Sequence, residues 1–310
     1  MFAPRRSTRP HDGAPSADHG CPFCPDHEDE TPPEIERWPA APASWQIRVV
    51  PNKFAALEAD GAPARQSDAD GFVSMPGLGR HEVVIESPDH DWDLATATDG
   101  EVEHVLQAYR ARHRALREAG AAAVIAFRNH REAAGTSLEH PHSQIVACPV
   151  VPDRIREQTA VATAHYDRFG TSPYVDVLER ELRGGTRIVL ESAGFVVFQP
   201  FAGTVAHETW LMPRAGTTSF ADATDEALAE LAMVLRRTLG GVAQLLDDPA
   251  YNLVVESAAT RDEDLPFLSW YVRVLPRLTV PAGFELGSGV SIVPAVPEET
   301  APALRAALPD

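Results

Sequence analysis

The chain has 310 residues, of which 44% are hydrophobic and 23% are charged, as is usual for a globular protein that buries a substantial core. Its net charge of −18 argues against nonspecific nucleic-acid binding, although a small anionic ligand needs only a few local donors. No apolar run is long enough to span a bilayer and the N-terminus lacks the apolar segment of a signal peptide, so we expect a cytoplasmic protein that is not in a membrane.

The first half of the chain is predicted to contain four strands and one helix. Residues 25–44 are rich in Pro and acidic side chains and are expected to form a loop, as are residues 58–72. The helix should begin at the capping box Thr98–Glu101 and end at Gly120, because apolar residues between them recur at helical spacing. The predicted strands are Trp45–Val50, His81–Glu86, Ala122–Phe127 and Ile145–Cys148.

A similar order of elements recurs in the second half. A strand at His207–Pro213 precedes a helix with leucines on one face between Leu228 and Leu246, and the strands Tyr251–Val255 and Trp270–Pro276 follow. Corresponding elements are about 126–129 residues apart by counting. We therefore expect two copies of a strand–helix–strand–strand unit, residues 1–150 and 151–310, in an α+β fold with antiparallel sheets and packed helices.

The strongest chemical signal is His140-Pro141-His142-Ser143-Gln144 before a predicted strand. Side chains at i and i+2 of an extended segment share a face, and Pro141 stiffens the segment. An imidazole with a pKa of about 6.5 is a good nucleophile near neutral pH and can form a covalent intermediate with phosphorus. Asn129, Ser137 and Gln144 can donate hydrogen bonds to phosphate oxygens, so the segment predicts phosphoryl chemistry rather than ordinary turn histidines.

A second signal is Cys21-Pro22-Phe23-Cys24. Three cysteines do not make a disulfide framework, and a Cys-x-x-Cys pair is typical of a metal or redox site. Tetrahedral zinc would need two more ligands, and the chain has no second such pair. From the residues alone the candidates for these ligands are His27, His81, His90, His130 and His140.

These stretches together resemble the galactose-1-phosphate uridylyltransferase family, a branch of the histidine-triad superfamily. The resemblance extends over nearly the whole chain in the same order. Its matching segments are residues 3–10, Cys21–Cys24, Val50–Leu57, Glu86–His90, Asn129–Gln144 and Ala282–Gly287.

The resemblance implies a role for each matching residue. His142 would be the nucleophile that becomes nucleotidylated, Gln144 would contact the transferred phosphoryl group, and His140 would hold the loop of His142 as a zinc ligand. The implied Zn2+ ligands are Cys21, Cys24, His90 and His140. The implied substrate-binding residues are Arg9, Asn52 and Phe54 for the nucleotide, Asn129 and Ser137 for phosphate, and Phe284 and Glu285 for the sugar phosphate across a homodimer interface.

The sequence departs from this family at two places that bear on function. The second half has Ser269-Trp270-Tyr271 where the family often has His-x-His, so we expect that half to have lost a second metal site. Lys53 follows the pocket Asn52 where the uridylyltransferases usually have Asp, as in phosphorylase-like relatives that handle ADP-sugars. The base and the sugar therefore stay open.

The sequence thus predicts a nucleotidyltransferase with tandem histidine-triad-like units, of which residues 1–150 hold the zinc site and the nucleophile. It would move a nucleoside monophosphate from a nucleoside diphosphate sugar to an acceptor phosphate, such as a sugar 1-phosphate, by ping-pong kinetics through His142. A phosphorylase or hydrolase of the same fold and a noncatalytic nucleotide-binding protein are the alternatives.

Overall fold

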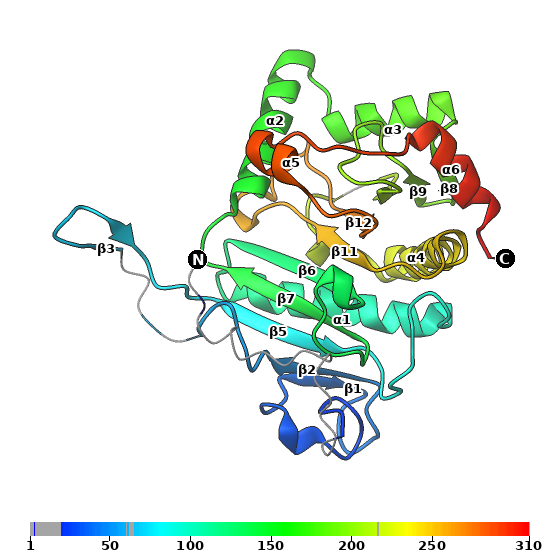
Figure 1. Ribbon diagram of the computed structural model, residues 1–310. Coiled ribbons are helices and arrows are strands. Elements are labelled where there is room, and N and C mark those ends of the chain that lie inside the picture. The colour runs from blue at the N-terminus through cyan, green and yellow to red at the C-terminus, as the bar shows by residue number, and fades with distance from the viewer. Residues whose placement is uncertain (1–2, 4–19, 60, 62–64, 216, 310) are drawn as a thin grey trace.

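One antiparallel sheet of ten strands runs through the computed structural model, which describes residues 3, 20–59, 61, 65–215 and 217–309. In spatial order the strands are β1 (Glu36–Trp38), β2 (Ile47–Pro51), β5 (Arg80–Ile85), β7 (His142–Cys148), β6 (Ala123–His130), β11 (Tyr251–Glu256), β12 (Tyr271–Pro276), β10 (Thr209–Pro213), β9 (Phe195–Phe198) and β8 (Ile188–Glu191). A separate hairpin of β3 (Gln66–Ser67) and β4 (Val73–Ser74) projects from the body of the molecule (Figure 1).

Two long helices, α1 (Asp99–Glu118) and α4 (Asp225–Leu246), pack side by side behind the sheet in the view of Figure 1. The capping box predicted for α1 is present: Thr98 Oγ1 accepts from the backbone N–H of Glu101, and Glu101 accepts from the backbone N–H of Thr98. The apolar stripes of both helices join inward-facing residues of the strands in one hydrophobic core. No helix among the described residues is long and apolar enough to cross a membrane.

The remaining helices lie outside this core. They are α2 (Asp153–Phe169), α3 (Pro173–Gly184), α5 (Gly283–Ser288) and α6 (Pro297–Ala306), with short 3-10 turns at Glu28–Glu30, Glu132–Ala134, Phe220–Asp222 and Thr260–Asp262. Leu178 of α3 packs against Val196, Phe198 and Met212, which point away from α1 and α4. Helix α3 therefore covers, in the second half, the sheet face that the first half uses for its polar residues.

The two halves are joined edge to edge. Strand β6 of the first half pairs with β11 of the second, with Asn129 opposite Asn252. The antiparallel sheets expected for the two units are thus one continuous sheet, and the α+β fold with packed helices is confirmed.

Most predicted elements appear within a few residues of their expected bounds, including both long helices and all seven strands. Two loop predictions were wrong in part: β1 lies within residues 25–44, and β3 lies within residues 58–72. Both are edge or isolated strands of two or three residues, too short to give a clear alternating pattern. The second half also contains β8, β9, α2 and α3, which were not predicted because they have no counterpart in the repeated unit.

Candidate active site

Strand β7 presents His142 and Gln144 on one face of the sheet. The strand alternates, so Ser143, Ile145 and Ala147 point to the opposite face, where Ile145 and Ala147 join the core beneath α1. His142 and Gln144 therefore project from the face that α1 leaves uncovered. Both are mostly buried, with 8% and 7% of their surfaces exposed.

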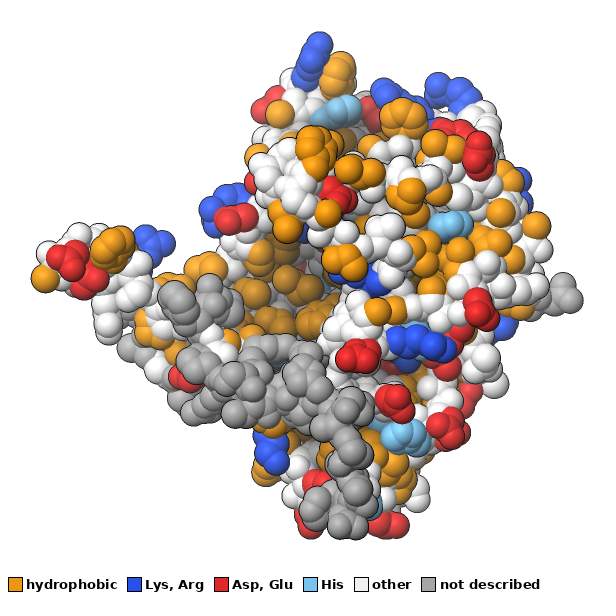
Figure 2. All heavy atoms as spheres, in the orientation of Figure 1, with side chains coloured by type: hydrophobic (Ala, Val, Ile, Leu, Met, Phe, Trp, Pro, Cys, Tyr) orange, Lys and Arg blue, Asp and Glu red, His pale blue; other side chains and the backbone are white. Residues whose placement is uncertain are grey.

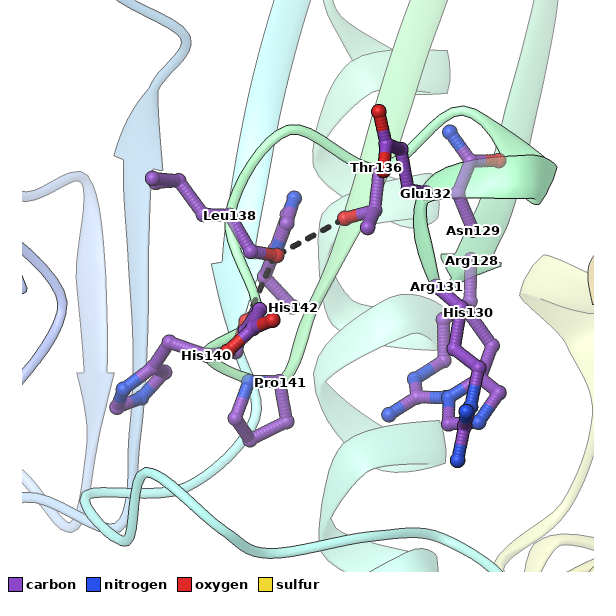
Figure 3. Close-up of a pocket in the computed structure, with 11 residues that line it drawn as sticks. Arg128, Asn129, His130, Arg131, Glu132, Thr136, Leu138, His140, Pro141 and His142 are labelled. Atoms are coloured by element: carbon purple, nitrogen blue, oxygen red, sulfur yellow. Dashed lines mark hydrogen bonds between the residues drawn. The ribbon is translucent and has the colours of Figure 1, made fainter. Parts of the chain in front are cut away.

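The ring of His142 is held by its own loop. Its Nδ1 lies 2.9 Å from the backbone carbonyl of His140, and Figure 3 shows this contact. A carbonyl can only accept, so Nδ1 carries the proton and the lone pair of the neutral imidazole is on Nε2. The ring of Phe23 meets the His142 ring edge-on with centroids 5.4 Å apart. The histidine thus has a fixed tautomer and a fixed orientation.

Four side chains from three distant segments form a cluster that could hold a metal ion. One ligand atom each from Cys21, Cys24, His90 and His140 lies within 4.8 Å of all the others. The Cys24 Sγ atom is 3.4 Å from His90 Nδ1 and 3.6 Å from His140 Nδ1, and the two Nδ1 atoms are 3.3 Å apart. Ligand atoms around tetrahedral zinc are about 3.3–3.8 Å apart, given Zn–S of about 2.3 Å and Zn–N of about 2.0–2.1 Å. The arrangement therefore fits a zinc ion.

The surroundings of this cluster favour a cation. Burial lowers the pKa of His140 to about 4, so its imidazole is neutral and able to bind a metal. Its Nε2 lies 2.9 Å from the carbonyl of Ser87, which orients the ring from behind. Burial, with the neighbouring Cys24, raises the pKa of the Cys21 thiol to about 11, so without a cation this sulfur stays protonated.

The other three histidine candidates lie elsewhere. His27 pairs with Glu30 near the surface, and His130 stacks on Tyr251 with its Nε2 3.0 Å from Asp248 Oδ1. His81 contacts Gln144, with His81 Nε2 2.8 Å from Gln144 Oε1.

His142 lies between two cavities. The first, of about 400 Å³, is lined by apolar side chains, including Phe23 and Phe54, and by polar ones, including Asn52, Lys53 and Ser137. The second, of about 540 Å³, has charges of both signs, because Glu132 and Glu139 also line it. Its other lining residues include Arg128, Asn129, His130 and Arg131. Figure 3 shows the second cavity with His142 on one side and these residues across from it. Figure 2 shows that this face of the molecule is hollowed near its middle and that hydrophobic side chains line the hollow.

The loop before β7 is shaped by Gly135 and by the second half of the chain. Gly135 has φ +94°, a conformation that favours glycine. Asn252 of β11 donates to Asn129 Oδ1 at 2.9 Å and to the carbonyl of Ala134 at 2.8 Å. Asn252 from the second half therefore orients Asn129 and fixes the loop before β7.

A buried ion pair supports the strands from below. Arg128 donates to Glu86 at 2.9 Å, and Glu86 also accepts from Tyr109 at 3.0 Å and from Ser143. Arg128 also donates to the Tyr251 hydroxyl at 2.8 Å. Burial and Arg128 lower the pKa of the nearby His130 to about 4, so His130 is neutral at physiological pH.

Some implied site residues are not at this centre. Arg9 lies outside the described residues. Phe284 is 60% exposed on α5, and Glu285 accepts from the backbone N–H of Ala282. Neither lines the two cavities that contain His142. Four residues that the fold brings to the site were not predicted from the sequence, namely Arg128 and Arg131 at the second cavity and Asp248 and Asn252 from the second half. Lys53, which the sequence singled out beside Asn52, lines the first cavity.

Strand register shows what the second half has at the equivalent positions. Val83 pairs with Val50 and Gln144, and Trp210 likewise pairs with Phe198 and Arg273. Arg273 therefore corresponds to Gln144, and Tyr271 corresponds to His142. A buried tyrosine and an arginine ion-paired with Glu208 stand where the first half has its histidine and amide.

Known proteins resemble the chain over most of its length. The family model for the N-terminal domain of galactose-1-phosphate uridyl transferase matches residues 4–152. An ADP-glucose phosphorylase of Arabidopsis thaliana is 29% identical over 98% of this chain and 89% of its own. A galactose-1-phosphate uridylyltransferase of Haemophilus influenzae is 30% identical over 76% of this chain and 68% of its own.

Solved structures agree with these matches. The crystal structure of the Arabidopsis ADP-glucose phosphorylase with bound ADP-glucose has a TM-score of 0.83 and covers 98% of this chain and 94% of its own. A uridylyltransferase structure at 28% identity has a TM-score of 0.81, with 94% and 91% covered. The chain therefore belongs to the galactose-1-phosphate uridylyltransferase family, and it is a nucleotidyltransferase.

Proposed function

We propose that this enzyme moves a nucleoside monophosphate from a nucleoside diphosphate sugar to an acceptor phosphate through a covalent intermediate on His142. The observation that carries the proposal is the position of His142. Its Nδ1–H donates to the carbonyl of His140, the lone pair of the neutral ring is on Nε2, and the ring lies between the first and the second cavity. The aromatic side chains of the first cavity suit a nucleoside, and the arginines of the second suit the leaving and accepting phosphates.

The reaction has two displacements at the same phosphorus atom. In the first, His142 Nε2 attacks the α-phosphorus, a P–N bond forms, and the P–O bond to the sugar 1-phosphate breaks with its electron pair on the leaving oxygen. In the second, an acceptor phosphate oxygen attacks and the P–N bond breaks. The hydrogen bond from Nδ1 to His140 stabilises the positive charge that develops on the imidazole.

Three polar side chains are proposed to bind the phosphates. Gln144 stands two residues after His142 on the same face of β7, so its amide can reach the phosphorus to which His142 bonds. Ser137 lines the first cavity, which we propose binds the nucleoside, and Asn129 lines the second cavity. Their neutral donors stabilise phosphate without adding a buried charge.

We propose that Cys21, Cys24, His90 and His140 hold a structural zinc ion. The four-ligand Cys/His set is closed, which is typical of structural rather than catalytic zinc. Because His140 supplies both a ligand nitrogen and the carbonyl that orients His142, the ion would fix the nucleophile indirectly. The thiols must stay reduced to bind it, which supports a cytoplasmic location.

A phosphorylase is the second candidate function. The Arabidopsis ADP-glucose phosphorylase matches almost the full length of the chain, and its crystal structure holds ADP-glucose. Lys53 at the first cavity and Arg131 at the second would each suit the phosphate groups of a ligand. In this version the donor is ADP-glucose and the acceptor is inorganic phosphate.

The test is intact-protein mass spectrometry after mixing the pure enzyme with nucleoside diphosphate sugars and no acceptor. We expect the mass of one nucleoside monophosphate to be added in the wild type and not in His142→Ala. The base of the nucleoside diphosphate sugar that forms the adduct identifies the nucleotide that the enzyme transfers. The isolated adduct, challenged with inorganic phosphate, sugar 1-phosphates or water, then separates phosphorylase, transferase and hydrolase. An adduct that survives in His142→Ala would overturn the proposal.

The zinc proposal is tested by metal analysis and by a pair of cysteine variants. Cys24→Ser should lose the metal, unfold at a lower temperature and form the adduct slowly. Cys148→Ser is the matched control, because Cys148 lies on β7 outside the cluster and is also half-buried. Equal metal content in the two variants would contradict the proposal.

We propose a homodimer in which α5 of one subunit completes the sugar-phosphate site of the other. Around α5 lie several exposed apolar side chains, Val280, Phe284, Leu286, Val290 and Ile292. His142→Ala and Phe284→Ala/Glu285→Ala enzymes, each impaired alone, should regain activity when mixed subunits form. Light scattering that finds only monomers, with full activity, would contradict this arrangement.

A further inference from the structure

The orientation of the Gln144 amide is decided by a residue that the proposed chemistry does not use. An amide can help His142 only if its N–H groups, and not its oxygen, face the phosphate oxygens. Gln144 Oε1 lies 2.8 Å from His81 Nε2. Which end of the amide faces the cavity therefore depends on which nitrogen of His81 carries the proton.

A backbone group settles the tautomer of His81. The N–H of Ala56 points at His81 Nδ1, with the two nitrogens 3.0 Å apart. A backbone N–H can only donate, so Nδ1 holds a lone pair and the proton of the neutral ring is on Nε2. Asn52 Nδ2 lies 3.1 Å from Nε2 and would suit the other tautomer, but that tautomer would set two N–H groups against each other at Ala56. The N–H of Ala56 is fixed by the backbone, whereas the side-chain amide of Asn52 can turn, so the contact at Ala56 decides.

The tautomer of His81 fixes the orientation of the Gln144 amide. Because His81 Nε2–H donates to Gln144 Oε1, the NH2 group of Gln144 is directed elsewhere, and Gln144 and His142 line the same cavity. We propose that His81 is a positioning residue, which holds the Gln144 amide with its N–H groups toward the phosphorus that His142 attacks. This inference rests on the proposed function, since it assigns the amide to the transferred phosphoryl group.

The second half of the chain has a different contact at the same place. By strand register Arg273 corresponds to Gln144, and Glu208, two residues before Trp210, corresponds to His81. Arg273 donates to Glu208 Oε1 at 3.0 and 2.8 Å, as a buried ion pair. There Arg273 is held in buried ion pairs with Glu208 and Glu256, whereas the neutral pair of the first half leaves two amide hydrogens for a ligand.

The first test compares two substitutions of His81. The amide of Gln reaches about as far from the backbone as His Nε2, whereas that of Asn reaches only as far as Nδ1. His81→Gln can therefore still donate to Gln144, and His81→Asn cannot. We expect His81→Asn to slow formation of the His142 adduct by about tenfold or more, below the roughly hundred- to thousandfold effect of removing an oxyanion donor altogether. His81→Gln should recover most of that rate, and uridine or adenosine, which lack phosphate, should bind all three proteins equally.

A double-mutant cycle separates positioning from a general structural effect. In a Gln144→Met background, His81→Asn should cause no further loss of rate, because the group through which it acts is gone. If His81→Asn is as harmful in that background as in the wild type, the proposal is overturned. An unchanged adduct rate in His81→Asn alone overturns it as well, while adduct formation by the wild type leaves the proposed function standing.

A second measurement does not depend on activity. Nitrogen NMR of the imidazole side chains in the resting protein should show His81 protonated on Nε2 and unprotonated on Nδ1. A proton on Nδ1 would overturn the inference whatever the enzyme does. If the tautomer is as expected but the wild type forms no adduct with any donor, the proposed function fails instead, and the His81–Gln144 contact is then only structural.

Discussion

Arg131 adopts a backbone conformation that side chains rarely tolerate. It has φ 66° and ψ 163°, a region used almost only by glycine, at the start of the turn that leads to Gly135. Two contacts hold it there: its carbonyl accepts from the N–H of Ala134 at 3.1 Å, and its guanidinium pairs with Asp248. Strain of this kind is kept at functional sites, and here it places Arg131 at the wall of the second cavity, which we propose binds phosphate.

Replacing this residue should separate strain from charge. Arg131→Gly removes both, so we expect the free energy of unfolding to rise by about 1 kcal/mol, the strain of about 1–3 kcal/mol less the entropy cost of glycine. Arg131→Ala removes the charge and keeps the strain. Both variants should use acceptor phosphate less well, as a raised KM, but only the glycine variant should be more stable in urea. Equal stability of the two would show that the backbone is unstrained.

Burial of His113 on α1 makes the fold sensitive to acid. Burial, with the nearby Arg117, lowers the pKa of His113 to about 4, and its Nδ1 is buried with no partner among the described residues. The unfolded chain binds this proton near pH 6.5, so the stability present above that pH is lost as pH falls toward 4. The loss is up to about 3 kcal/mol, from about 1.4 kcal/mol per pKa unit.

We therefore expect His113→Leu to lose less stability than the wild type between pH 7 and 4.5, measured by urea unfolding at each pH. His104→Leu is the control, because His104 is exposed on the same helix. If the two variants follow the same pH profile, burial of His113 has no part in the acid sensitivity.

Single residues were predictable from sequence where their partners lie close along the chain. His140, His142 and Gln144 form a local pattern, and Cys21 with Cys24 another, so their grouping follows from spacing alone. His81 was considered only as a metal ligand, because the residues beside it in the sequence give no indication that it contacts Gln144, 63 positions later. Asp248 and Asn252 contact the site only through the pairing of β6 with β11. Such contacts are set by tertiary topology and leave no local signal.

At the scale of elements, the position of His81 depends on how closely β5 approaches β7. Gly79 immediately precedes β5, and a Cβ there would overlap the backbone carbonyl of Ala147 on β7 and the side chain of Leu57. Only glycine allows this approach, which brings His81 over Gln144.

Gly79→Ala should push the start of β5 away from β7. We expect a loss of about 1–3 kcal/mol in the free energy of unfolding and slower adduct formation on His142. Gly77→Ala is the matched control, because its Cβ would meet Leu57 at 3.6 Å and the carbonyl oxygen of Ala56 at 4.0 Å, both ordinary contacts. Thermal unfolding and the adduct rate of both variants check the expectation, and an equal response would mean that the close approach is not required.

Elements were predictable in proportion to the apolar surface they bury. Helices α1 and α4 have seven and nine buried residues in regular stripes, and both were found from the sequence. Helices α2 and α3 each bury only two residues, among them Glu181, and they have no counterpart in the first half. The repeat therefore gave no expectation that α3 covers the second half on the face where the first half keeps its cavities open.

For the whole molecule, the repeat in sequence does not make two independent domains. The main core is continuous across α1 and α4, and Arg110 and Arg114 of α1 donate to the carbonyls of Ala223 and Ala221 in the second half. Separating the halves would expose the long strand β6 on one side and β11 on the other as unpaired edges. We therefore propose that the expected boundary between residues 1–150 and 151–310 separates two repeats within a single folding unit.

We expect neither residues 1–150 nor residues 151–310 to fold alone, and the full chain to unfold in one cooperative transition. Each fragment should show poorly dispersed amide NMR signals and no sharp melting, since half of the shared core is missing. The two fragments refolded together should regain structure and form the His142 adduct, because Asn252 can again hold Asn129 and the loop of the nucleophile. A cooperatively folded 1–150 fragment that forms the adduct by itself would mean that the second half is dispensable for the chemistry.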